Sequence, residues 1–368
     1  MNTEIHMRKS SRATGMTRRQ FLAAVAASPL LQGDGAADDK GIRSHAFGRD
    51  WSKVRGFNYQ PSWGSNDVSI WCHFREDQFA RELDLGRTHF PGIGSLRIWF
   101  SPNAWLADRS AFLAAATKAM TLMAERGLEM IPVYFNGWHS YPSWHGFTHA
   151  QLRQHRDNGD FAMFRQYTRE LHGAIAGHGK ILLQDVSNEP FNLVGGNKDH
   201  VDLTLKFLRT IADELHALAP ETPVSVGTQG QGPYDIGWVD PFVDIHAIHP
   251  YVFIPGDAEK TAANLKKFDA CIGRLIQFGK PALATECCWG SNDDDLRAAA
   301  VRDELALLQR HGIGFLPHAL HHSAVADLHR PHPWQTWRSM YMGFIEPDGS
   351  LRKGHGVFNE EWARSEPR

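Results

Sequence analysis

After residue 50 the chain alternates between short apolar runs and longer segments in which apolar residues recur at helical spacing. The runs predict strands and the longer segments predict helices, which together are typical of βαβ units around a parallel sheet. The predicted strands are residues 54–60, 95–100, 130–135, 181–189, 223–227, 243–249, 280–286 and 312–319. The predicted helices are residues 76–85, 108–127, 161–178, 201–218, 258–278 and 294–309. We therefore expect an α/β protein with a (β/α)8 TIM barrel.

The length of the chain fits one such barrel. A chain of 368 residues exceeds an ordinary domain, but a single (β/α)8 barrel with insertions covers this range. No internal repeat, low-complexity tract or linker follows residue 50. We expect one barrel domain over residues 45–368, with a cleft shaped by long loops at 137–160 and 321–337.

The first 40 residues have the pattern of an export signal. The twin arginines Arg18 and Arg19 precede an apolar stretch at 21–31 that is too short to span a bilayer comfortably. We predict a bacterial twin-arginine signal and disordered lead over residues 1–40, export to the periplasm or the extracellular space, and no stable membrane anchor. The alternative is a disordered basic tail.

Two of the predicted strands end in a glutamate. The strand at 181–189 turns polar at its end, and Pro190 disfavours its continuation beyond Glu189. The strand at 280–286 ends in Glu286, 97 positions later (286 − 189), which fits strands 4 and 7 at roughly 30 or more residues per βαβ unit. Catalytic groups of such barrels lie at these strand ends. Either glutamate alone is also explained by a helix cap or a surface strand end.

Two carboxylates across a barrel mouth are what hydrolysis of a glycosidic bond requires. We predict a retaining mechanism in which Glu286 is the nucleophile and Glu189 is the acid/base. In that mechanism one carboxylate attacks the anomeric carbon, while the other protonates the leaving oxygen and then deprotonates water. The two carboxyl groups must then lie about 5–5.5 Å apart.

Four polar residues near these strand ends fit the same chemistry. Arg97 is placed to hold Glu286 ionised, because a nearby cation lowers the pKa of a carboxyl group. Tyr251 can donate a hydrogen bond to the nucleophile, and Asn188 can bind a sugar hydroxyl. His249 is either a site residue or a satisfied core histidine.

Composition adds two constraints. A net charge of −2 gives no electrostatic reason to expect a nucleic-acid partner. The chain has 12 Trp, and although core packing explains any one of them, the group favours a carbohydrate cleft, because flat apolar rings suit the faces of sugars. Those at predicted strand ends and loops are Trp63, Trp71, Trp99, Trp105, Trp138, Trp144, Trp289, Trp334 and Trp337.

The four cysteines show no zinc-type spacing. Cys287 and Cys288 follow Glu286 directly, and adjacent cysteines rarely bridge each other because the disulfide strains the backbone. The plain interpretation is small buried thiols beside the site, while a disulfide between Cys72 and Cys271 stays open. Nothing in the sequence calls for a cofactor.

Five short motifs fall on these strand ends: Gly-Phe-Asn-Tyr at 56–59, Leu-Arg-Ile-Trp at 96–99, Asn-Glu-Pro at 188–190, His-Pro-Tyr at 249–251 and Thr-Glu at 285–286. Together they resemble the glycoside hydrolase family 5 (cellulase-like) group of clan A, over most of the chain after residue 50. The resemblance implies the same roles for Glu189 and Glu286 as the residues do. It also implies substrate contacts for Arg97, Asn188, His249 and Tyr251.

Two positions depart from that family's pattern. The tryptophan usual at the end of the eighth strand is absent from residues 315–322, and His318 or Trp289 is the candidate replacement. The histidine of the third strand is also not evident, and its candidates are Asn136, Trp138 and His139. The resemblance is therefore closer to the clan than to family 5.

Two other functions compete. The 21 His, with a cluster at 318–322, suggest a metal-dependent barrel hydrolase, but the first strand lacks the His-x-His of such enzymes and the fourth ends in Glu. We therefore expect no metal. A non-catalytic carbohydrate-binding barrel is the second alternative. The expected partner is a β-linked glucan, mannan, xylan or oligosaccharide. The sequence does not decide among these or between endo and exo action, because loops build the subsites. It also leaves the oligomeric state open.

Overall fold

A computed structural model describes residues 41–137, 149–192, 197–229, 233–325 and 341–360. The predicted export signal at 1–40 lies outside these residues, as do most of the two predicted loops. Trp138, His139, Trp144, Trp334 and Trp337 also lie outside them. Among the helices of this part of the chain, none is long and apolar enough to cross a membrane.

Parallel strands form the centre of the described chain, in two hydrogen-bonded sets. The first set is β3 (Gly56–Asn58), β4 (Ser95–Trp99), β5 (Glu129–Asn136), β6 (Gln184–Asn188) and β7 (Val224–Gly227). The second set is β8 (His246–Ile248), β9 (Ala282–Ala284) and β10 (Gly314–Phe315). Parallel bridges join the sets at both seams, from Thr228 to Ile248 and from Asn58 to His318. The ring is therefore closed, and the predicted (β/α)8 barrel is confirmed.

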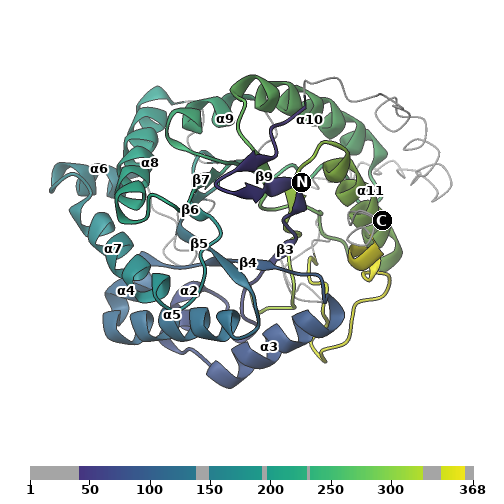
Figure 1. Cartoon of the computed structure of the whole chain (residues 1–368), viewed down its shortest axis with the longest axis horizontal. Helices are drawn as coiled ribbons and strands as arrows, with labels where there is room; N and C mark the ends of the chain where they lie inside the picture. Colours follow the sequence, from purple (N-terminus) through teal and green to yellow (C-terminus); the bar gives the residue numbers. More distant parts are fainter. Residues whose placement is uncertain (1–40, 138–148, 193–196, 230–232, 326–340, 361–368) are drawn as a thin grey trace, which may run out of the picture.

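The helices surround this ring (Figure 1). They are α2 (Asp67–Cys72), α3 (Glu76–His89), α4 (Pro102–Ala107), α5 (Arg109–Ala124), α6 (His149–Asp157), α7 (Ala162–Ala176), α8 (Lys198–Leu218), α9 (Pro233–Val239), α10 (Ala258–Phe278) and α11 (Asp294–Arg310). Asparagine or aspartate caps start several of them, as Asp108 does for α5 and Asp293 for α11, by accepting a hydrogen bond from the first turn. The six predicted helices are all present, with ends that shift by a few residues.

Several predicted boundaries are wrong. The interval 137–160 is not all loop, because α6 lies within it, and the short helices α2, α4 and α9 were missed because six or seven residues show no clear helical period. The eighth strand was predicted over residues 312–319, but only Gly314–Phe315 pair as a strand. The apolar run is longer than the strand because residues beyond the ladder are also buried, as Leu316 and Ala319 are.

The segment of the chain before the first barrel strand covers the amino-terminal end of the barrel. The hairpin of β1 (His45–Ala46) and β2 (Arg49–Asp50) leads into a 3₁₀ turn, and this purple segment crosses the centre of the ring in Figure 1. Trp51, with 1% of its surface exposed, packs there with the inner strand residues Ile131, Leu183 and Leu283. The polar groups of the candidate site lie at the opposite end, where the strands finish.

The tryptophans divide between core and site. Trp71 and Trp105 are buried in the layer between strands and helices, where Trp71 stacks on Phe100. For these two, core packing is the correct explanation and the cleft interpretation is wrong. Trp99 and Trp289 instead lie beside the polar groups described below.

Close backbone contact at β10 gives a stability test. A Cβ atom on Gly314 would lie 2.3 Å from the carbonyl oxygen of Trp51, so Gly314→Ala should destabilise the protein by about 1–3 kcal/mol. Gly273, on the exposed side of α10, has nothing within 4 Å, so Gly273→Ala should stabilise it by about 0.5–1 kcal/mol. Thermal unfolding of both variants checks this. A Gly314→Ala variant as stable as wild type would contradict the close packing of Gly314 against the backbone of Trp51.

Candidate active site

Arg97 lies at the centre of the carboxyl end of the barrel, on β4. Its side chain has no exposed surface and donates three short hydrogen bonds: Nε to Asp185 Oδ2 (2.8 Å), Nη1 to Glu286 Oε1 (2.6 Å) and Nη2 to Asn188 Oδ1 (2.8 Å). Its guanidinium is thus shared by strands β6 and β9. The predicted pairing of Arg97 with Glu286 is present. These three hydrogen bonds of Arg97 all go to protein side chains, which they orient.

Glu286 follows β9 by two residues and is 5% exposed. Tyr251 donates its hydroxyl to Oε2 (2.8 Å), and His318 Nδ1 lies 3.5 Å from the same oxygen. Burial by itself would raise the pKa of Glu286, but the neighbouring His249, His318 and Arg97 hold that pKa well below its usual range. This carboxylate is therefore kept ionised, as a nucleophile requires.

Tyr251 keeps its proton at this position. Burial, together with the charge of Glu286, raises the pKa of the Tyr251 hydroxyl well above its usual value. A protonated phenol can only donate to a carboxylate oxygen, so it fixes one lone pair of Glu286.

Glu189 follows β6 directly and is 8% exposed. Its Oε1 lies 2.7 Å from His249 Nδ1, and Asn192 Nδ2 donates to its Oε2 at 2.5 Å. The other ring nitrogen of His249 lies 3.1 Å from Thr285 Oγ1. His249 is therefore both satisfied in the core and in contact with the candidate acid/base.

The two glutamates face each other. One carboxylate oxygen of each, with a ring nitrogen of His249, all lie within 4.8 Å of one another. This is close to the separation of about 5–5.5 Å found in retaining glycosidases and shorter than the roughly 6.5–9.5 Å of inverting ones.

The backbone at these positions is strained. Glu189 (φ 46°), Tyr251 (φ 40°) and Cys288 (φ 72°) all adopt the left-handed region, which residues other than glycine rarely enter. Such conformations persist where the surroundings over-determine them and are common at functional sites. Among the described residues, Phe47, Asp160 and Phe161 also have positive φ, and the other three lie on segments that carry or follow the candidate catalytic groups.

The remaining predicted site residues gather at the same end of the barrel. Asn188 donates to Asn136 Oδ1 (3.2 Å), while Trp289 packs edge-on against Tyr251 at 5.3 Å between centroids. His318, which with Trp289 is a candidate to replace the eighth-strand tryptophan, lies 5.7 Å from Trp99 between ring centroids. Trp138 was predicted as well and lies outside the described residues.

Sequence reasoning missed three polar partners and one ring. Asn58 accepts from Arg97 (3.1 Å), and Asn192 and Asp185 were described above. Asp185 and Asn188 are three residues apart, so a regular strand would turn them to opposite faces. A register shift between them turns both toward Arg97. The ring is that of Trp99, which sequence reasoning grouped with the cleft tryptophans but did not pair with Arg97, and the Arg97 guanidinium stacks over it at 4.6 Å.

The four cysteines are free thiols, so the disulfide left open between Cys72 and Cys271 is absent. Cys271, Cys287 and Cys288 are buried, and burial raises the pKa of each thiol. The predicted buried character holds for these three, whereas Cys72 is half-buried.

Glu189, His249 and Glu286 also have the spacing of a metal site, and no other such group occurs among the described residues. However, the Arg97 guanidinium lies 2.6 Å from Glu286 and places a positive charge beside any bound cation. The two carboxylates also already accept bonds from Tyr251 and Asn192. These residues therefore fit acid–base chemistry better than metal binding.

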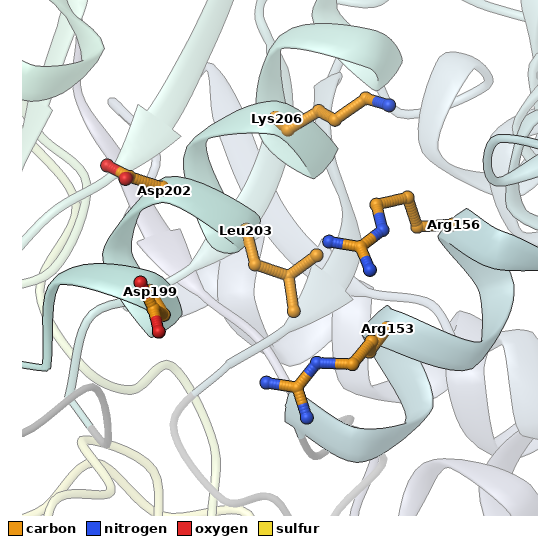
Figure 2. Close-up of a pocket in the computed structure, with 6 residues that line it drawn as sticks. All are labelled: Arg153, Arg156, Asp199, Asp202, Leu203 and Lys206. Carbon is orange, nitrogen blue, oxygen red and sulfur yellow. The ribbon is translucent and has the colours of Figure 1, made fainter.

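A surface cleft lies between α6 and α8, away from this site (Figure 2). It is lined by Arg153, Arg156, Asp199, Asp202, Leu203 and Lys206. Its charges are partly neutralised, since Lys206 pairs with Asp160 (2.7 Å) and Arg156 with Asp157 (2.8 Å). None of the lining residues contacts the glutamates, so the strand ends are the better candidate site.

The sequence matches no protein-family model. A search of curated proteins also finds no match. The structure, in contrast, is similar to many solved structures.

Three of these structures are named as mannosidases or mannanases. The exo-beta-1,4-mannosidase Op5Man5 from Opitutaceae bacterium strain TAV5 has a TM-score of 0.69 at 18% identity, over 90% of this chain and 62% of that one. The endo-beta-1,4-mannanase from Thermotoga petrophila has a TM-score of 0.62 at 15% identity, over 86% and 78%. The glycoside hydrolase family 5 mannosidase from Rhizomucor miehei has a TM-score of 0.56 at 14% identity, over 84% and 92%. At these identities the similarity establishes the TIM-barrel fold that this chain shares with such glycosidases.

Removal of the buried cation gives a pH-dependent test. Arg97→Met leaves Asp185 and Glu286 buried without it, so the free energy of unfolding should fall by about 3–5 kcal/mol near pH 7. The pKa of Glu286 is depressed in the wild type. The contribution of ionised Glu286 to the free energy of unfolding is therefore lost as pH falls through that low pKa. In the variant the carboxyl pKa values rise, so the loss should shrink near pH 4.

Urea unfolding at both pH values measures this difference. The exposed pair of Arg126 with Asp84 supplies the control, and Arg126→Met should cost less than about 1 kcal/mol at either pH. An Arg97→Met loss that is the same at both pH values would show that the buried charges do not carry it.

Proposed function

We propose that the protein is a retaining glycoside hydrolase that cleaves a β-linked poly- or oligosaccharide by double displacement. The observation that carries this proposal is the pair of glutamates at the carboxyl end of a (β/α)8 barrel, one carboxylate oxygen of each lying within 4.8 Å of the other. The spacing supports retention, and the different surroundings of the two carboxylates support different roles.

Glu286 is the nucleophile in this proposal. Arg97 and Tyr251 each hold one of its oxygens, which orients the carboxylate toward the anomeric carbon. The bond to the leaving oxygen breaks as the bond from Glu286 forms, which gives a covalent glycosyl-enzyme. Asn188, itself oriented by Arg97, binds the hydroxyl next to the reacting carbon.

Glu189 is the acid/base. It gives its proton to the leaving oxygen in the first step and removes a proton from water in the second. His249 and Asn192 fix its two oxygens, so the same carboxyl group is in position for both steps.

A β-mannosidic substrate is the first choice within this class, because the three similar structures named above are a mannosidase, a mannanase and a family 5 mannosidase. Trp99 packs against His318 and Trp289 packs against Tyr251, the two residues beside Glu286, and these groups supply rings and an imidazole for the sugar at the reacting position. Export by the twin-arginine route is part of the same proposal and rests on the pattern of residues 1–40.

The first test is reducing-sugar release from β-mannan, β-glucan and xylan by wild type and Glu286→Gln. Wild type should release sugar, and the variant should lose activity on the order of 10⁴-fold or more, with little change in melting temperature. A chelator should have no effect, because the two-glutamate mechanism needs no metal. Near wild-type turnover by the variant would contradict the assignment, and inhibition by the chelator would favour a metal-dependent hydrolase.

The second test separates the two carboxylates. Glu189→Ala should act poorly on polymers, yet azide should accelerate its action on an activated aryl glycoside and yield a glycosyl azide. The small anion can attack the glycosyl-enzyme without help from a base, and the activated leaving group needs no acid. The product is identified by mass spectrometry and NMR, with Glu286→Gln as the control that azide does not rescue. Full activity of Glu189→Ala without azide would remove Glu189 from the acid/base role.

A further inference from the structure

Helix α11 carries two buried charged residues that the proposed mechanism does not use. Arg297 and Glu304 both have no exposed surface. They are seven residues apart on the helix, which is close to two turns, so both project from the same side. That side faces the segments that follow β8, β9 and β10.

Arg297 donates four hydrogen bonds to backbone carbonyl groups. Nη2 bonds the carbonyl oxygens of Cys288 (3.0 Å) and His318 (2.9 Å), and Nη1 bonds those of Tyr341 (3.2 Å) and Met342 (3.0 Å). Cys288 lies two residues after Glu286, and the His318 side chain lies 3.5 Å from the Glu286 carboxylate. One guanidinium therefore joins the segment that carries the nucleophile to the segment that carries its imidazole neighbour.

Glu304 holds the third segment beside the nucleophile. Its Oε2 accepts from the backbone N–H of Phe253 (3.3 Å). Burial raises the pKa of Glu304 to about 7, and the nearby backbone amides of Cys288, Phe253 and Val252 oppose that rise. Val252 and Phe253 directly follow Tyr251, whose hydroxyl donates to Glu286. Arg297 thus bonds the carbonyl of Cys288, and the carboxylate of Glu304 lies near its amide.

The two segments held in this way are strained. Tyr251 and Cys288 have positive φ angles of 40° and 72°. Such residues return to ordinary backbone angles unless neighbouring groups prevent it. The fork of an arginine suits this task, because it presents donors in a fixed plane that the single ammonium of a lysine cannot reproduce.

We propose that Arg297 and Glu304 are positioning residues that set the geometry of Glu286, Tyr251 and His318 from outside the barrel. Neither touches the substrate, and both act through the backbone. The catalytic consequence rests on the proposed function, whereas the hold on the backbone does not.

Arg352 provides a matched control. It is also buried and donates to the backbone carbonyls of Tyr341, Gly343 and Ser291 and to the Asp294 side chain. It bonds neither Cys288 nor His318. Among the described residues, it shares only the Tyr341 carbonyl with Arg297, and replacing it perturbs a comparable buried network without touching a group in contact with Glu286.

The experiment compares Arg297→Lys, Glu304→Gln and Arg352→Lys in the full chain. With an aryl glycoside, the first two variants should lose about 10- to 100-fold in kcat with KM within about twofold, since a small misplacement of reacting groups acts mainly on the chemical step. Arg352→Lys should keep kcat within about threefold at a similar loss of melting temperature. Equal losses of kcat in all three variants would overturn the proposal.

Hydrogen–deuterium exchange supplies a readout that needs no activity. Peptides covering 251–253 and 286–289 should exchange faster in Arg297→Lys and Glu304→Gln than in Arg352→Lys. Unchanged exchange in both would overturn the proposal even if the wild type proves inactive, whereas an inactive wild type with the expected exchange would overturn the proposed function alone. If Arg297→Lys does not fold, Glu304→Gln decides, because it keeps the shape and one carbonyl acceptor.

Discussion

A buried charge needs oppositely charged and hydrogen-bonding partners, and Arg97 imposes this constraint on the carboxyl end of the barrel. Its guanidinium has no exposed surface and lies between two carboxylates and two side-chain amides. Loss of Arg97 would leave two buried carboxylates without their cation, which costs far more than the net gain from such a pair. The ends of β3, β4, β6 and β9 are therefore tied to one side chain, and the position of Glu286 follows from it.

The same constraint separates the surroundings of the two glutamates. Glu286 lies against a guanidinium, a phenol and an imidazole, so burial cannot protonate it. Glu189 lies against His249 and Asn192, and no guanidinium among the described residues contacts it. Two carboxyl groups of one residue type can then differ in the proton they carry, which is the requirement for a nucleophile and an acid/base at one site.

The site also depends on groups outside the ring of strands. Tyr251 and Cys288, in the segments that follow β8 and β9, leave the regular ladder in left-handed conformations, and no ladder hydrogen bond among the described residues holds their backbone N–H groups. Buried side chains of α11 and backbone contacts from residues 341–345 reach these segments instead. A barrel of very short strands thus gains a rigid mouth from its helical layer.

The sequence by itself determined the barrel, the strands that carry the two glutamates, and Arg97 and Tyr251 as partners of Glu286. Alternating apolar runs and helical periods are local signals, and the topology of parallel βαβ units places every strand end at one mouth. Only the tertiary structure decided the rest. Asp185 turns inward because of a register shift, Asn58 reaches Arg97 from β3, Trp99 of the same strand β4 stacks on Arg97, and Trp71 packs in the core. The hold of Arg297 on Cys288 and His318 was equally invisible, because it runs through backbone carbonyl groups that every residue carries.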